Sequence, residues 1–352
     1  MSTEQRYTGL AIALAWPQTF CKQPGSWYDP VTRSLGINRN NYYRAGHAAL
    51  VLVDGIHQKC HYFDFGRYHA PYKHGRVRSG ETDHDLEMKT IPEISDDGKT
   101  LLNYPEILEE MQRNPACHGE GPLHASYAPI NFKAALNKAL RMQSDSPIQY
   151  GPFISGGSNC SRFVNTAILS GKPGLFSRLR LKYLIPFSPT PLNNVYALHH
   201  RTSVPVLRDQ APFLPVRPLS RPELTSTLPQ PARYAGIPEN AQWLSGEGAG
   251  SWFAFTFEED ILKVTRYSPD GNIECRGNYQ GPLEQVAGAD QSAIVDYPSN
   301  CKEFVLKADG KKLIFSRMFD DVMSQSHTSE LLLVQCIFSL LIRVGSSSET
   351  VG

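Results

Sequence analysis

The sequence lacks the features that define several large classes of protein. Its seven cysteines include no Cys-X-X-Cys pair and are widely spaced, at positions 21, 60, 117, 160, 275, 301 and 336. This pattern argues against a zinc ribbon or a compact disulfide framework and favours reduced thiols. The 35 Lys and Arg residues nearly balance the 34 Asp and Glu residues, whereas a dedicated nucleic-acid binder carries a strongly basic balance. We therefore expect no nucleic-acid partner.

Long apolar runs are also missing. The run at residues 10–16 is short and follows no basic segment, which argues against a cleavable secretory signal. A second run, at residues 331–344, is interrupted by Gln335 and Ser339 and is too short to span a bilayer comfortably. We expect it to form a docked terminal helix or strand. The sequence thus predicts a cytoplasmic protein without a membrane span, and it leaves open export by a route that needs no cleavable signal.

The length and composition predict a globular protein of about two domains. The 352 residues are 41% hydrophobic and 20% charged, near the norm for globular chains, and no internal repeat is evident. We divide the chain into a first domain at residues 1–170, a linker at residues 171–240 and a second domain at residues 241–352. The predicted fold class is α+β.

Proline is abundant in the middle region. Ten of its prolines lie between Pro186 and Pro231, and since proline removes helix and ladder donors we expect this stretch to be largely extended. It also carries basic residues such as Arg178 and Arg201, with Asp209 as a nearby acid. The segment is therefore interpreted as a linker wrapped over the first domain, with a polyanion-binding groove as the alternative.

The last region is typical of short antiparallel strands. Residues 251–257 and 262–267 are β-prone, and a turn signal at residues 268–271 leads into residues 272–275. Residues 302–307 and 312–315 flank an Asp-Gly turn and predict a second hairpin. We expect a small antiparallel β domain and find no catalytic constellation in it.

A helix is predicted to begin at Cys160. Ser158 and Asn159 are good N-cap residues, apolar residues recur at helical spacing from 163 to 168, and Gly171 supplies a stop. A thiol at this end feels the positive pole of the helix dipole, which favours the thiolate. The amide groups at Cys160 and Asn159 are candidates for holding an oxyanion. The alternative is a structural cysteine in the first turn.

A β-hairpin is predicted earlier in the chain, from residues 46–53 and 60–68 with a loop at residues 54–59. Pairing Val53 with Cys60 places His47, Tyr62 and Asp64 on one face. The other face is then mostly apolar, which favours this register. The other parity would place His61 beside His47 instead of Asp64, so the identity of the partner stays open between the two.

These residues together have the character of a cysteine-dependent active site. A histidine can take the thiol proton and later protonate a leaving group. A carboxylate can fix its tautomer and stabilise the imidazolium. Cys160, His47 and Asp64 are therefore our candidate catalytic residues, although a lone strand histidine is more often structural.

The same residues carry a resemblance to a known fold. A Gly-His-Ala strand with His47, a polar residue on the next strand and Asn-Cys-Ser-Arg-Phe at Cys160 resemble the circularly permuted papain-like fold, which includes lecithin–retinol acyltransferase-like proteins and bacterial amidase relatives. In ordinary papain-like enzymes the cysteine helix precedes the histidine strand, and here the order is reversed. The string at residues 62–69, with residues 74–78 and 82–86, is similar to a bacterial domain family of unknown function. The resemblance covers residues 8–170 and implies an antiparallel sheet packed on the cysteine-bearing helix.

Other polar residues receive more limited predictions. His57, Cys60 and His61 point to different faces of a hairpin, so we expect no metal site, and no cofactor is implied. Histidines and arginines crowd residues 67–84 and predict either a pocket wall that meets a carboxylate or phosphate, or a solvated strand face. The candidate substrate contacts are Tyr62, Arg67, His69 and Trp16.

The sequence as a whole predicts a cysteine-dependent hydrolase that cleaves an amide bond, in a peptide or an N-acyl compound, through an acyl-enzyme. The alternatives are an acyltransferase or thioesterase on the same fold, or a non-catalytic binding module. The expected partner is a small-molecule or peptide substrate. The oligomeric state is not predicted.

Overall fold

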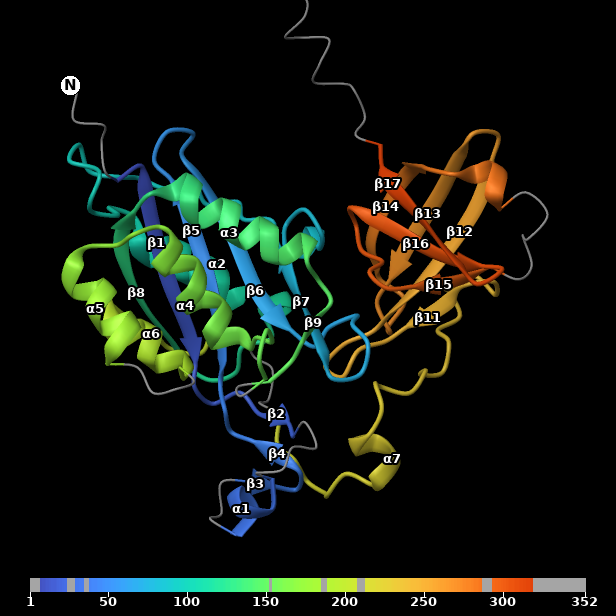
Figure 1. The fold of residues 1–352 in the computed structure, drawn as a ribbon, viewed down its shortest axis with the longest axis horizontal. Coiled ribbons are helices and arrows are strands. Elements are labelled where there is room, and N and C mark those ends of the chain that lie inside the picture. The colour runs from blue at the N-terminus through green and yellow to red at the C-terminus, as the bar shows by residue number, and fades with distance from the viewer. Residues whose placement is uncertain are drawn as a thin grey trace, which may run out of the picture.

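The structure, a computed structural model, describes residues 7–23, 29–34, 38–151, 154–184, 189–207, 213–286 and 293–318. It has the predicted α+β class, with a first domain of helices and sheet and a separate, nearly closed C-terminal β domain (Figure 1). The apolar run at residues 331–344 lies outside the described residues.

The first domain is built around one antiparallel sheet in the order β10-β8-β1-β5-β6-β7-β9. Its strands are β1 (Gly9–Trp16), β5 (His47–Asp54), β6 (Lys59–Gly66), β7 (His74–Ser79), β8 (Leu123–Ile130), β9 (Ile148–Gln149) and β10 (His199–Val204). The β5–β6 hairpin and its loop are therefore where the sequence predicts them.

Helices cover both faces of this sheet. The helices α3 (Phe132–Ser144), α4 (Cys160–Ser170) and α6 (Pro191–Ala197) pack on one face, and α2 (Tyr104–Arg113) packs on the other. Strand β1 is buried along its whole length, and its alternate residues enter the two cores. The central position of this strand explains why it reads as a continuous apolar run.

A small three-stranded sheet interrupts the chain between β1 and β5. Its strands are β2 (Cys21–Lys22), β3 (Asn38–Arg39) and β4 (Tyr42–Tyr43), in the order β2-β4-β3, and the short helix α1 (Asp29–Ser34) accompanies them. In Figure 1 this unit projects from one end of the large sheet. It brings Cys21 and Lys22 to that end, beside the start of β5.

The expectation that residues 171–240 are largely extended is wrong for their first half. Helix α5 (Leu175–Tyr183), helix α6 and edge strand β10 all belong to the first domain, and a short helix α7 (Arg221–Leu224) follows. The prolines Pro191 and Pro222 stand in the first turn of α6 and α7, where the missing N–H has no helical partner to lose. The extended connection is shorter than expected and begins after β10.

The β domain contains the predicted hairpins. Its strands, in sheet order, are β11 (Gln242–Leu244), β12 (Ser251–Glu258), β13 (Ile261–Tyr267), β14 (Ile273–Gln280), β17 (Lys311–Arg317), β16 (Glu303–Ala308) and β15 (Ile294–Asp296). The Gln242 side chain joins the two edge strands, donating to Ala293 O at 2.9 Å and accepting from Val295 N at 2.8 Å. The sheet is thereby almost closed.

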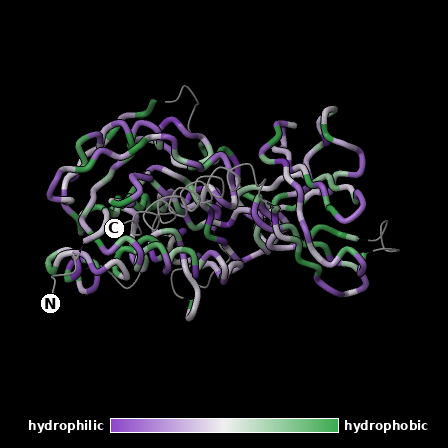
Figure 2. Tube along the Cα trace, turned by 90° about the horizontal axis from the view of Figure 1, so that it is seen from above, coloured by the Kyte–Doolittle hydropathy of each residue, from purple (hydrophilic) through white to green (hydrophobic). Residues whose placement is uncertain are grey.

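Buried charges join the two domains beside β7, where Figures 1 and 2 show the β domain against the first domain. Asp83 accepts two hydrogen bonds from Arg76 and one, at 2.9 Å, from Arg266 of β13. His69 is hydrogen-bonded to Ser251 of β12 at 2.7 Å. Because these groups are more than nine-tenths buried, His69, Arg76 and Asp83 form an interdomain contact here and not a solvated strand face.

Candidate active site

Cys160 is the first residue of α4, as the sequence predicts. The Asn159 side chain accepts a hydrogen bond from Arg162 N at 2.8 Å and so caps the helix. Phe163 and Ala167 of the same helix are fully buried against the sheet. The cap and the buried face fix the first turn, and with it the direction of the thiol.

The β5–β6 register is the predicted one. Val53 pairs with Cys60 and Ala49 pairs with Asp64, while His61 pairs with Leu52. His61 lies on the opposite face, with its ring 5.6 Å from that of Phe132. The structure therefore brings Asp64, and not His61, to the face of His47.

His47 lies between Asp64 and Cys160. Its Nε2 atom is 3.3 Å from Oδ2 of Asp64, at ion-pair distance but without the alignment of a hydrogen bond. Its other ring nitrogen, Nδ1, is then the one available to Cys160, which interacts directly with His47 and accepts from the Ala48 amide. All three side chains are buried, and Cys160 is the most exposed at 7%.

Asp64 is held as a carboxylate by its neighbours. Arg78, its partner across the β6–β7 ladder, donates from Nε to Oδ1 at 3.0 Å and from Nη2 to Oδ2 at 2.5 Å. The Tyr62 hydroxyl donates to Oδ2 at 3.1 Å. Burial alone would raise the pKa of Asp64, but the Arg78 guanidinium and His47 hold that pKa well below its usual range.

The same group of charges favours the ionised forms of both His47 and Cys160. Burial lowers the pKa of His47, but contact with Asp64 and Cys160 outweighs it and raises the pKa to about 9. Burial also opposes ionisation of Cys160, and the neighbouring His47 nevertheless lowers the pKa of the thiol. These opposite shifts are the arrangement that a thiolate–imidazolium pair requires.

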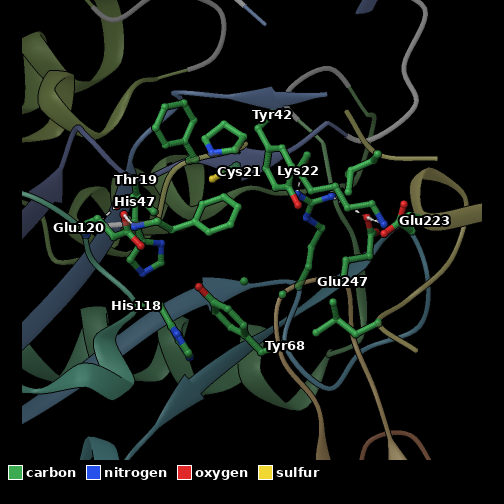
Figure 3. A pocket seen from close by; sticks show the side chains of 18 of the residues that line it. Thr19, Cys21, Lys22, Tyr42, His47, Tyr68, His118, Glu120, Glu223 and Glu247 are labelled. Atoms are coloured by element: carbon green, nitrogen blue, oxygen red, sulfur yellow. Dashed lines mark hydrogen bonds and ion pairs between the residues drawn. The ribbon is translucent and has the colours of Figure 1, made fainter. Parts of the chain in front are cut away.

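A cavity of about 490 Å³ opens beside His47. Figure 3 shows His47, Glu120 and His118 toward one end of it and Lys22, Glu223 and Glu247 toward the other. Cys160 and Asp64 are not among its lining residues. The volume is within the range of small-molecule sites.

The connection after β10 forms one wall of this cavity. Lining residues from it include Phe213, Pro215, Val216 and Leu228. Glu247, which follows β11, accepts from Arg67 at 2.7 Å and pairs with Lys22 at 3.7 Å, and its side chain is fully buried. The cavity therefore needs both domains and the segment between them.

The four predicted substrate contacts do not all lie in the cavity beside His47. Arg67 lines the cavity. The Tyr62 hydroxyl donates a hydrogen bond to Asp64. Trp16 is fully buried, its ring stacks on that of His47 with centroids 6.0 Å apart, and its indole N–H donates to Gln112 at 2.7 Å. His69 lies in the interdomain contact described above, where it also lines a second cavity. Trp16 and Tyr62 do not reach the cavity beside His47 because they point from central strands into a closed core.

Two cavity residues were missed by sequence reasoning. His118, in a left-handed conformation with φ 50°, stacks on Tyr68 with ring centroids 4.7 Å apart. Burial and the nearby Arg78 lower the pKa of His118 to about 3, so its imidazole is neutral. Cys21 also lines the cavity, and burial raises its pKa to about 12. No local pattern marked either residue, because the cavity is assembled from distant segments.

The described residues also bear on metal binding and on membrane insertion. No group of three or more His, Cys, Asp and Glu side chains in them is arranged to hold a metal ion. None of the helices in the same part of the chain has the length and apolar character needed to cross a membrane.

Comparison with known families gives two matches. Residues 11–173 are similar to the family described as Type VI secretion system effector TseH-like, and this region contains both His47 and Cys160. Residues 241–318 are similar to a family described as the DUF6695 C-terminal domain. Comparisons with curated proteins and with solved structures gave no match.

Proposed function

We propose that the first domain is a papain-like cysteine hydrolase that cleaves an amide bond, and that the chain acts as a secreted effector. One observation carries the proposal: the imidazole of His47 stands between the Asp64 carboxylate and the Cys160 sulfur. The similarity of residues 11–173 to a type VI secretion effector family supports the effector role. His47 precedes Cys160 in the chain, which is the order expected of the permuted papain-like group.

In the proposed reaction, the Cys160 thiolate attacks the carbonyl carbon of the amide. The tetrahedral oxyanion is held by the Cys160 amide at the start of α4, where the helix dipole is positive. The His47 imidazolium gives its proton to the leaving nitrogen, the carbon–nitrogen bond breaks, and an acyl thioester remains. A water molecule then attacks the thioester and gives a proton to His47, which releases the acid and restores the ion pair.

Asp64 acts on His47 and not on the substrate. It holds the ring orientation and stabilises the imidazolium. Arg78 and Tyr62 keep the carboxylate in place, so their role is one of positioning. Asn159, predicted as an oxyanion contact, uses its side-chain oxygen to cap α4 and contributes by orienting the first turn.

Labelling of the purified chain with iodoacetamide tests the proposal. An activated Cys160 is expected to react well below pH 8 and faster than the other cysteines, with the site identified by mass spectrometry. Cys21 lines the cavity beside His47 and has a raised pKa, so it provides an internal control. Equal labelling of Cys160 and Cys21 below pH 8 would contradict the proposal.

Turnover is then measured with peptide amides, N-acyl amides, esters and thioesters. Loss of all cleavage in a folded Cys160→Ser variant is expected. Preference for thioesters, or product formation only with an added amine or alcohol acceptor, would indicate acyl transfer on the same site. Absence of turnover together with an unreactive Cys160 would favour a binding module.

A further inference from the structure

Helix α5 is amphipathic in the opposite sense to an ordinary surface helix. Its inner face is small: Ser177 and Leu181 are buried, at 1% and 2% exposure. Its outer face carries large apolar side chains with 41–73% of their surface exposed, namely Leu175, Phe176, Leu179 and Tyr183. A soluble domain normally turns such residues inward.

The flanks of this outer face are basic. Helical spacing places Lys182 on one side of the apolar stripe and Arg180 on the other, with Arg178 nearer the domain. Residues 146–208 contain no aspartate or glutamate. In the part of the chain that the structure describes, none of the three cations enters an ion pair.

An outward apolar stripe with basic flanks and no acidic residues is the pattern of a helix that lies in the interface of a membrane. Nucleic acid would match the charge but would leave the leucines in water. Anionic lipid matches both features, because the apolar stripe enters the acyl boundary and the cations meet headgroup phosphates. Tyr183, with the Lys182 ammonium 5.0 Å from its ring centre, is of the residue type that prefers the headgroup level.

The helix is also preformed. It packs through Leu181 on the first domain, and the Asn165 side chain donates to Leu181 O at 3.2 Å. The helix is therefore ordered before docking, so docking loses no further entropy in forming it and needs no conformational change. In Figure 1, α5 lies at the end of the first domain that is farthest from the β domain.

We propose that the outer face of α5 docks on an anionic lipid bilayer and holds the first domain at a membrane surface. The helix is nine residues long, about 13 Å, so it lies on the membrane and does not span it. This inference does not depend on the proposed chemistry.

Flotation of the full chain with lipid vesicles tests the inference. The chain is expected to bind vesicles of equal parts phosphatidylglycerol and phosphatidylcholine, and not vesicles of phosphatidylcholine alone. The double variant Phe176→Ser/Leu179→Ser is expected to weaken binding at least about tenfold, since it removes two large apolar contacts. Ile56→Ser, at an apolar position that is 72% exposed on the far end of the β5–β6 hairpin, is the matched control.

A second pair of variants tests the charge. Neutralising Arg180 and Lys182 together, each to glutamine, is expected to weaken binding about fivefold per residue, and Lys311→Gln on β17 is the control. Thermal unfolding confirms that each variant is folded. Equal binding to neutral and anionic vesicles, undiminished binding by the α5 variants, or binding to DNA or heparin but not to vesicles would each overturn the inference.

Discussion

Replacing Asp64 with asparagine removes one negative charge from a fully buried position and keeps the side-chain shape. At 3.3 Å and an effective dielectric constant near 20, the attraction between Asp64 and an imidazolium is about 5 kcal/mol. Without it, the burial that lowers the pKa of His47 is no longer outweighed. We expect that pKa to fall from about 9 to below neutrality. Cys160 then loses its cationic neighbour, and burial raises the pKa of its thiol.

The effect on labelling follows from two opposing factors. At pH 6.5 a thiol with an ordinary pKa near 8.5 is about 1% ionised, so ionisation falls up to about 100-fold relative to a fully formed ion pair. A more basic thiolate is a better nucleophile, and a Brønsted coefficient near 0.45 returns about threefold for each unit by which the thiol pKa rises. Each unit above the pH costs about tenfold in ionisation, so the net loss in alkylation rate is about threefold per unit. The pH profile is the more sensitive readout, and its midpoint is expected to move upward.

The variant also leaves Arg78 buried without its partner, which costs about 3–5 kcal/mol. The double variant Asp64→Asn/Arg78→Met removes both charges together and provides a folded comparison if the single variant unfolds. Cys160→Ser in the same background identifies the labelled residue. An alkylation profile of either folded variant that superimposes on that of the wild type would refute the role of Asp64.

Three further predictions concern the surroundings of the site. Tyr62→Phe removes one hydrogen bond to Asp64 and is expected to lower the free energy of unfolding by about 1 kcal/mol, measured by urea titration; an unchanged value would mean that the bond is not formed. Glu247→Gln leaves Arg67 without its buried counter-charge, so thermal unfolding should begin at a lower temperature and proteases should cut the connection between the domains faster. Protease resistance equal to that of the wild type would contradict this. The Arg76 and Arg266 guanidinium groups outweigh burial and hold the pKa of Asp83 well below its usual range. Its stabilising contribution is thus complete above about pH 4 and is lost as the pH falls toward the lower pKa of the folded state, which chemical unfolding between pH 5 and pH 2 would show; stability that is flat over this range would refute it.

The sequence predicts the β5–β6 register because one face of the hairpin has to be apolar. That condition alone brings Asp64 to the face of His47, and capping rules alone place Cys160 at the start of α4. Local physics thus defines the three candidate residues. Their chemical roles stay a proposal, since they depend on reactivity.

The rest of the site could not be predicted, because its partners are far apart in the chain. Arg67 and Glu247 are separated by 180 positions, and no periodicity links an arginine after one strand to a glutamate in another domain. Proline counts misled the interpretation of residues 171–204 for a different reason. A proline in the first turn of a helix is favourable, so position within the element matters more than number.

The segment that connects the two domains supplies a wall facing His47, although it contributes nothing to the sheet or to the helix that bears the sulfur. In the proposed enzyme, selectivity and reactivity are thereby encoded in separate stretches of chain. Substitutions within residues 213–229 would reshape the cavity and leave Cys160, His47 and Asp64 in place.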